Sequence, residues 1–140
     1  MATFNKFNQF VEDLAEKVHD LGADTLKIML VNSPAPAAGN SVKADLTEIT
    51  AQNGYAAGGS TVTITGSSQT SGTYSLVGTD LVFTASGGSF GPFQYAVLYN
   101  DTPTSPADPL IGWWDYGSSI SLNDGETFTV DFGASILTLA

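Results

Sequence analysis

The sequence of 140 residues predicts one β-rich domain of the α+β class, an antiparallel β-sandwich of about seven strands with one N-terminal amphipathic helix packed against it. Three observations lead to this class. Apolar residues recur with a helical period only within residues 1–22, short segments of residues 23–140 are typical of strands, and turns rich in Gly, Pro and Asn separate those segments. Residues 32–59 are expected to form a long loop of the sandwich.

The helix is predicted from residues 4–21, where seven apolar side chains recur mostly at steps of three and four residues. This spacing places them along one face of an amphipathic helix. Thr3 is suited to cap the start of this helix and Gly22 to end it. We expect the three phenylalanines of the apolar face to dock the helix on the sheet of the same chain, and docking on another chain is the alternative.

The strands are predicted from segments rich in β-branched and aromatic residues, several of which alternate between two faces. These segments are TLKIMLV, STVTIT, TYSLV, LVFTA, FQYAVLY, PLIGWWDY, ETFTVDF and SILTLA. Residues 78–80 and 123–126 have the composition of tight hairpin turns. Within the long loop we expect at most a short turn of helix or strand around residues 46–49.

The charge of the chain limits its partners. Fourteen carboxylates, four lysines and no arginine give a net charge of -10, and the lysines all lie in the first third of the sequence. Such a field repels phosphate backbones and anionic membranes, so neither nucleic acid nor a membrane is an expected partner. No stretch has the apolar length of a signal peptide or a transmembrane helix, and we therefore expect synthesis in the cytoplasm.

A GxSxG pattern at residues 87–91 places Ser89 where some hydrolases carry their nucleophile. That motif requires a strand that turns into a helix, but Pro92 and a predicted strand follow here. The one histidine, His19, precedes the serine in the chain and is expected on the solvated flank of the helix. The pattern therefore indicates a glycine-rich loop between strands, and no catalytic residue is predicted.

Two pairs of carboxylates could suggest a cation site: Asp101 with Asp108, and Asp124 with Glu126. Calcium requires six to eight oxygen ligands, and no EF-hand spacing occurs. The absence of cysteine also removes thiolate zinc sites and disulfides. We therefore expect solvated turn carboxylates, no metal, no cofactor and no enzymatic activity.

The most informative region is an aromatic hairpin over residues 93–116. If Tyr99 pairs with Leu110, the antiparallel register places Tyr95 opposite Trp114 and Ala96 opposite Trp113. Both faces of this hairpin are apolar, so something must cover the second face. The N-terminal helix is the preferred cover, and the alternatives are another subunit or a sugar stacked on a tryptophan.

Adjacent strand residues point to opposite faces, so the two tryptophans must have different surroundings. Trp114 belongs to the denser aromatic face and is expected in the core. Trp113 is expected on the side that meets a partner. The candidate interface residues on this interpretation are Trp113, Ile111, Leu98, Phe4 and Phe7.

Four stretches together resemble a family of small structural proteins encoded in tailed-bacteriophage genomes: FNKFNQFVEDLAEKVHDLGADTLKIMLVN, NGYAAGG, GPFQYAVLYND and LIGWWDYGSSISLNDGETFTVDF. The resemblance covers essentially the whole chain. It implies a virion component made in the bacterial cytoplasm, with the major capsid protein or other virion subunits as partners and a homo-oligomeric state. A capsid decoration (cement) protein is the favoured role, and the alternatives are a tail or baseplate component and a carbohydrate-binding module of a fibre or spike.

Overall fold

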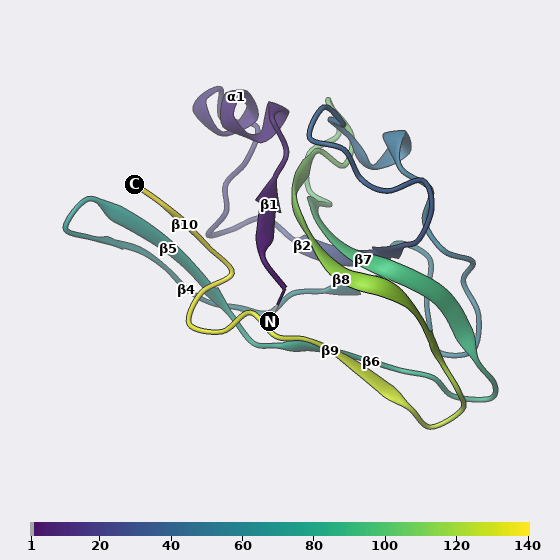
Figure 1. Cartoon of the computed structure of the whole chain (residues 1–140). Helices are drawn as coiled ribbons and strands as arrows, with labels where there is room; N and C mark the ends of the chain where they lie inside the picture. Colours follow the sequence, from purple (N-terminus) through teal and green to yellow (C-terminus); the bar gives the residue numbers. More distant parts are fainter. Residues whose placement is uncertain (1) are drawn as a thin grey trace.

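The computed structural model describes residues 2–140, which form one short α-helix, one 3-10 turn and ten strands (Figure 1). The elements in chain order are β1 (Phe4–Lys6), α1 (Gln9–Ala15), β2 (Leu26–Val31), η1 (Lys43–Asp45), β3 (Ser60–Thr61), β4 (Ile64–Thr70), β5 (Thr73–Gly78), β6 (Leu81–Thr84), β7 (Phe90–Asn100), β8 (Leu110–Leu122), β9 (Thr127–Val130) and β10 (Leu137–Leu139).

The strands form three antiparallel sheets, with the orders β1-β8-β7-β2-β3, β10-β5-β4 and β6-β9. The predicted class, β-rich with one helix, is confirmed. The predicted count of about seven strands in two sheets is not, because the structure has ten strands in three sheets. One buried cluster joins the sheets, and it includes Trp114 of β8, Leu76 of β5, Phe83 of β6 and Val130 of β9.

The predicted long helix was wrong. The chain first forms β1, which pairs with β8 through Phe4 opposite Trp114, and only then forms the seven-residue helix α1. The helix ends at Ala15, and Lys17 adopts a left-handed backbone conformation with φ of 66°. A spacing of three residues between phenylalanines fits a helix, but it fits a strand followed by a helix equally well, and pairing with β8 decides between them.

The β1–β8 pairing depends on Gly112. A β-carbon at this position would lie 2.3 Å from the Phe4 ring and 2.7 Å from the backbone oxygen of Asn5. We expect Gly112→Ala to displace β1 and to lower the free energy of unfolding by about 1–3 kcal/mol, measured by urea denaturation. The control is Gly39→Ala, where nothing lies within 4 Å of the added carbon. Equal stability of the two variants would contradict this role of Gly112.

The register of the aromatic hairpin matches the prediction at one pair and then shifts. Tyr99 lies opposite Leu110 as predicted, but a bulge follows, and Leu98 lies opposite Gly112. The next pairs are displaced by one residue, so Trp113 lies opposite Val97 and Trp114 opposite Ala96, not Tyr95. Further irregularities follow, and Phe93 lies opposite Ile120. A shift of one residue exchanges the faces of all partners on the other strand.

The two predicted hairpins do not occur as paired strands. The turn at residues 123–126 forms, with the Glu126 N–H donating to the Asn123 carbonyl oxygen at 2.9 Å, but it leads from β8 into a strand of a different sheet. Residues 78–80 likewise lead from β5 to β6, which also lie in different sheets. Composition predicted the turns but not the partners of the flanking strands.

The second face of the hairpin is covered by the protein's own chain, but not by the helix that was expected to do so. Phe7, Met29, Val31, Val97, Tyr99 and Leu110 form a second buried cluster there. Leu46 of the long loop 32–59 packs against it, while α1 contributes Phe10 to the main core. Phe7, placed just after β1, and the loop therefore do the covering.

Candidate interaction surface

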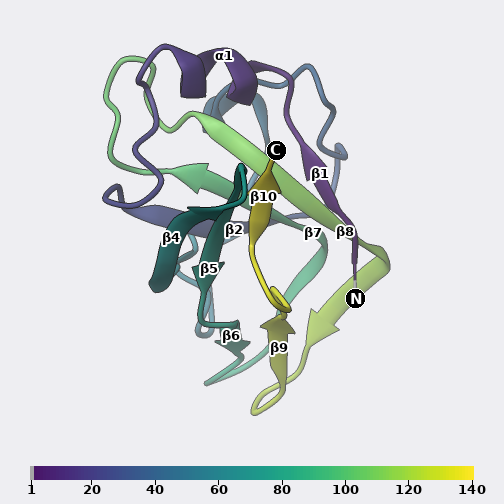
Figure 2. The same cartoon turned by 90° about the vertical axis from the view of Figure 1, so that its left-hand side faces the viewer.

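An apolar groove lies where two sheets end. β1 is the terminal strand of the five-stranded sheet and β10 that of the three-stranded sheet. Figure 2 shows β10 ending below α1, with β1 on one side and β5 on the other. A groove of about 350 Å³ runs between them, and it is lined by Phe4, Lys6, Phe10, Val11, Leu14, Leu137, Thr138, Leu139 and Ala140. Lys6 is the one charged side chain in this lining.

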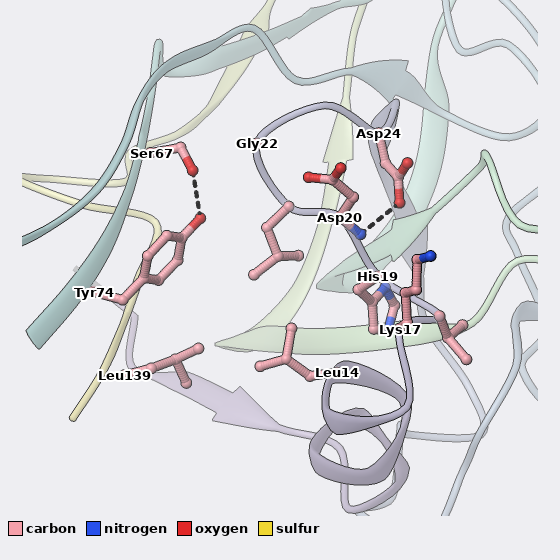
Figure 3. Close-up of a pocket in the computed structure, with 11 residues that line it drawn as sticks. Leu14, Lys17, His19, Asp20, Gly22, Asp24, Ser67, Tyr74 and Leu139 are labelled. Atoms are coloured by element: carbon pink, nitrogen blue, oxygen red, sulfur yellow. Dashed lines mark hydrogen bonds between the residues drawn. The ribbon is translucent and has the colours of Figure 1, made fainter.

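A second cavity of about 510 Å³ adjoins the groove, and Leu14 and Leu139 line both. Ser67 and Tyr74 form one wall, where their hydroxyl oxygens lie 2.9 Å apart. The connection of residues 17–24 forms the opposite wall (Figure 3). Groove and cavity thus meet at these two leucines beside α1, and together they are termed the opening.

Exposed apolar surface also gathers at this opening. Val11 of α1 is 52% exposed and lines the groove. Among residues 2–140, Val82 of β6 is the other large hydrophobic side chain with this degree of exposure. Val11 therefore adds one exposed apolar side chain to the lining of the groove.

The four lysines fall into two pairs, one bound to carboxylates and one placed at this opening. Lys27 and Lys43 each pair with a carboxylate, at 3.5 and 3.6 Å. Lys6 lines the groove and Lys17 the adjoining cavity, and within residues 2–140 neither has a carboxylate oxygen within 4.0 Å. The ammonium groups that could meet a partner's carboxylates are therefore placed at this opening.

The structure separates the five candidate interface residues. Phe7, Leu98 and Ile111 are fully buried, so they offer no side-chain surface to a partner and are corrected here to core residues. Phe4 is half-buried and lines the groove, and Trp113 is half-buried on the opposite face of the sheet. The residues that the sequence did not single out are those of β10 and Val11.

The two tryptophans have different surroundings. Trp114 is 4% exposed in the main core, and the Phe4 ring meets it edge-on with centroids 5.3 Å apart. Trp113 stacks obliquely on Phe7 of the second cluster, at 4.5 Å. Trp114 therefore fills the core as predicted and has no free ring for a sugar.

His19 is buried, and its predicted position on a solvated flank was wrong. Because α1 ends early, the chain turns back and places the imidazole against Phe10, with ring centroids 5.3 Å apart and the residue 6% exposed. Its Nδ1 lies 3.0 Å from Nδ2 of Asn100. Ser89 lies elsewhere, in the turn before β7, where its carbonyl oxygen accepts from Asn53.

The carboxylate pairs have structural partners. Asp124 accepts a hydrogen bond from the Gly87 N–H at 2.9 Å, and Asp101 pairs with Lys27. Burial, followed by the charge of Asp101, raises the pKa of Asp108. Within residues 2–140 no group of three or more His, Asp or Glu side chains could hold a metal ion, and no helix is long and apolar enough to cross a membrane.

Comparison with known proteins adds no counterpart for the groove. No protein-family model matches the chain, and no curated protein or solved structure matches it.

Proposed function

We propose that this chain is a structural protein of a tailed-bacteriophage virion, and that it acts as a capsid decoration protein bound to the outside of the shell. The resemblance of its sequence to phage structural proteins supports a place in the virion. The observation that carries the binding role is the apolar groove between β1 and β10, with Val11 exposed at its side. The partner in this proposal is the major capsid protein.

The two strands beside the groove suit this role. Each is the last strand of its sheet, so one edge of each has no neighbouring strand within residues 2–140. Such edges present backbone N–H and C=O groups to an added extended segment. The apolar side chains between them would contribute roughly 25 cal/mol for each Å² of apolar surface that a coat segment buries there.

The remainder of the molecule suits attachment to a shell that contains DNA. The two buried clusters on either face of the five-stranded sheet make a rigid body that can join neighbouring coat subunits and oppose the pressure of packaged DNA. The net charge of -10 keeps the outer surface soluble and prevents it from binding nucleic acid.

The direct test is to mix the purified protein with expanded capsids that lack it and to sediment the mixture. Co-sedimentation at a fixed number of copies for each coat subunit is the expected result. Immunogold labelling of the virion then shows whether the protein lies on the capsid or on the tail. Failure to co-sediment, with label on the tail, would replace the decoration role by a tail or baseplate role. Sedimentation of the free protein tests the predicted homo-oligomer.

Two matched valines test whether the groove is the contact. Val11 and Val82 are both 52% exposed, but only Val11 lines the groove. We expect Val11→Glu to weaken capsid binding by about tenfold or more, because it places a charge against an apolar contact. Val82→Glu is expected to bind like the original protein. Equal binding by both variants would place the contact elsewhere on the molecule.

A further inference from the structure

The buried imidazole of His19 is held by an amide whose orientation the structure determines. Asn100 is fully buried at the end of β7, and its Oδ1 accepts from the Thr102 N–H at 3.1 Å. Its Nδ2 lies 2.7 Å from Asp24 Oδ2 and 3.0 Å from His19 Nδ1. The reversed orientation would set the amide oxygen against a carboxylate and the NH2 group against the Thr102 N–H. Only the observed orientation gives both the oxygen and the NH2 group of Asn100 partners of the right kind.

This orientation fixes the protonation of His19. Nδ2 of Asn100 has two hydrogens, one for the Asp24 carboxylate and one for the imidazole, so Nδ1 of His19 must accept. An accepting Nδ1 means a neutral ring with its hydrogen on Nε2. A proton added to Nδ1 would face the N–H of Asn100 and break the bond. The neutral ring is therefore the form that the fold requires.

The charged groups around the ring and its burial shift the pKa of His19 in opposite directions. Asp13 of α1 and Asp24 of the connection before β2 both favour the imidazolium. Burial opposes it and is the larger effect, so the pKa of His19 lies below its usual 6.5. Within residues 2–140, Nε2 of His19 and Oδ2 of Asp13 are buried without a hydrogen-bond partner, so in the present arrangement neither form of the ring gains a hydrogen bond at Nε2.

His19, Asn100 and Asp24 thus fasten the connection between α1 and β2 to the end of β7. His19 and Asp24 bind the same amide group, and Asp24 Oδ2 also accepts from the Asp20 N–H at 2.8 Å. Residues 17–22 and 24 of this connection line the 510 Å³ cavity. We propose that these three residues form a pH-sensitive latch: a neutral His19 holds the connection closed, and protonation at Nδ1 releases it and opens the cavity wall beside the groove.

The sign of the effect follows from the lowered pKa. The unfolded chain binds a proton at His19 near pH 6.5, whereas the folded chain binds it only at lower pH. The contribution of the latch to stability is therefore complete above pH 6.5 and is lost as the pH falls from there through the folded-state pKa. The connection between α1 and β2 is therefore expected to open in mildly acidic solution. This inference does not depend on the virion role.

Because His19 is the one histidine of the chain, every imidazole signal in a nitrogen-15 NMR spectrum belongs to it. At about pH 8 we expect the tautomer with hydrogen on Nε2. On titration to about pH 5, the midpoint should lie below 6.5. Hydrogen-exchange protection of the Val18 and Asp24 N–H groups should fall at least about tenfold with the same midpoint. Protection of the Glu126 N–H, in the turn at residues 123–126, is the internal control.

The variant His19→Gln distinguishes an effect of His19 titration from an effect of the carboxylates around it. Its side chain does not titrate, so the loss of protection with that midpoint should disappear. Three results would overturn the proposal: hydrogen on Nδ1 at neutral pH, a midpoint at or above 6.5, or the same loss of protection in His19→Gln. The first two are read from the original protein and remain decisive if the variant does not fold.

Discussion

Replacement of Trp114 by alanine is expected to lower the free energy of unfolding by about 3–5 kcal/mol, the largest effect among the substitutions considered. The indole is 4% exposed and meets Phe4 and Phe132, with ring centroids 5.3 and 5.6 Å away. Its removal leaves a cavity among the strands β1 and β8 and the segment after β9 that the rigid sheets cannot close. Urea denaturation, followed by circular dichroism, measures the change.

The neighbouring Trp113 is the matched control. It is half-buried and stacks on Phe7 at the edge of the second cluster. Trp113→Ala therefore removes less buried surface, and we expect a loss of about 1–2 kcal/mol. A larger cost for Trp113 than for Trp114 would contradict the observed register of the hairpin.

Replacement of Glu48 by alanine is expected to detach the long loop and to cost about 2–3 kcal/mol. Its Oε2 accepts from the Tyr55 hydroxyl at 2.6 Å and from the Gly58 N–H at 2.7 Å, and Oε1 pairs with Lys43 at 3.6 Å. The same tyrosine hydroxyl accepts from the Leu30 N–H at 2.9 Å, so one carboxylate connects the loop to β2. Hydrogen exchange over residues 32–59 locates the loosened region.

The control for this network is Glu48→Gln, which keeps an acceptor oxygen for both bonds but loses the charge. We expect it to cost under about 1 kcal/mol. Burial and the hydrogen bond to Glu48 raise the pKa of Tyr55 above its usual value, so the phenol remains a donor throughout the neutral range. Equal destabilisation by Ala and Gln would mean that the charge, and not the pair of hydrogen bonds, fastens the loop.

All strand positions except that of β1 could be predicted from the sequence, but strand partners could not. Every segment that was expected to be extended contains a strand, because β-branched and aromatic content is a local property. Pairing is not local. The turns at residues 78–80 and 123–126 have hairpin composition, yet each joins two sheets. The bulge after Tyr99 is likewise invisible to alternation, although it changes which side chains accompany each tryptophan.

The candidate site was harder to predict for a related reason. Phe4 was named as a contact candidate through a helix that does not form, and Leu98 and Ile111 were named through a register that is shifted by one residue. His19 was expected in solvent because its place on a long helix would have been exposed. Once α1 ends at Ala15, the same sequence turns inward. A single boundary of a secondary-structure element thus decides the environment of the one histidine.

The pairing of β1 with β8 has a consequence for synthesis of the chain. Asn5 and its partner Trp113 are 108 positions apart. At about 5–20 residues per second, a ribosome needs roughly 5–20 s to make the chain between them. During that time Phe4 and Phe7 have emerged without the aromatic partners that later cover them. The segment with Phe4 and Phe7 is therefore made well before its partners, and its apolar side chains stay uncovered while the chain between them is synthesised.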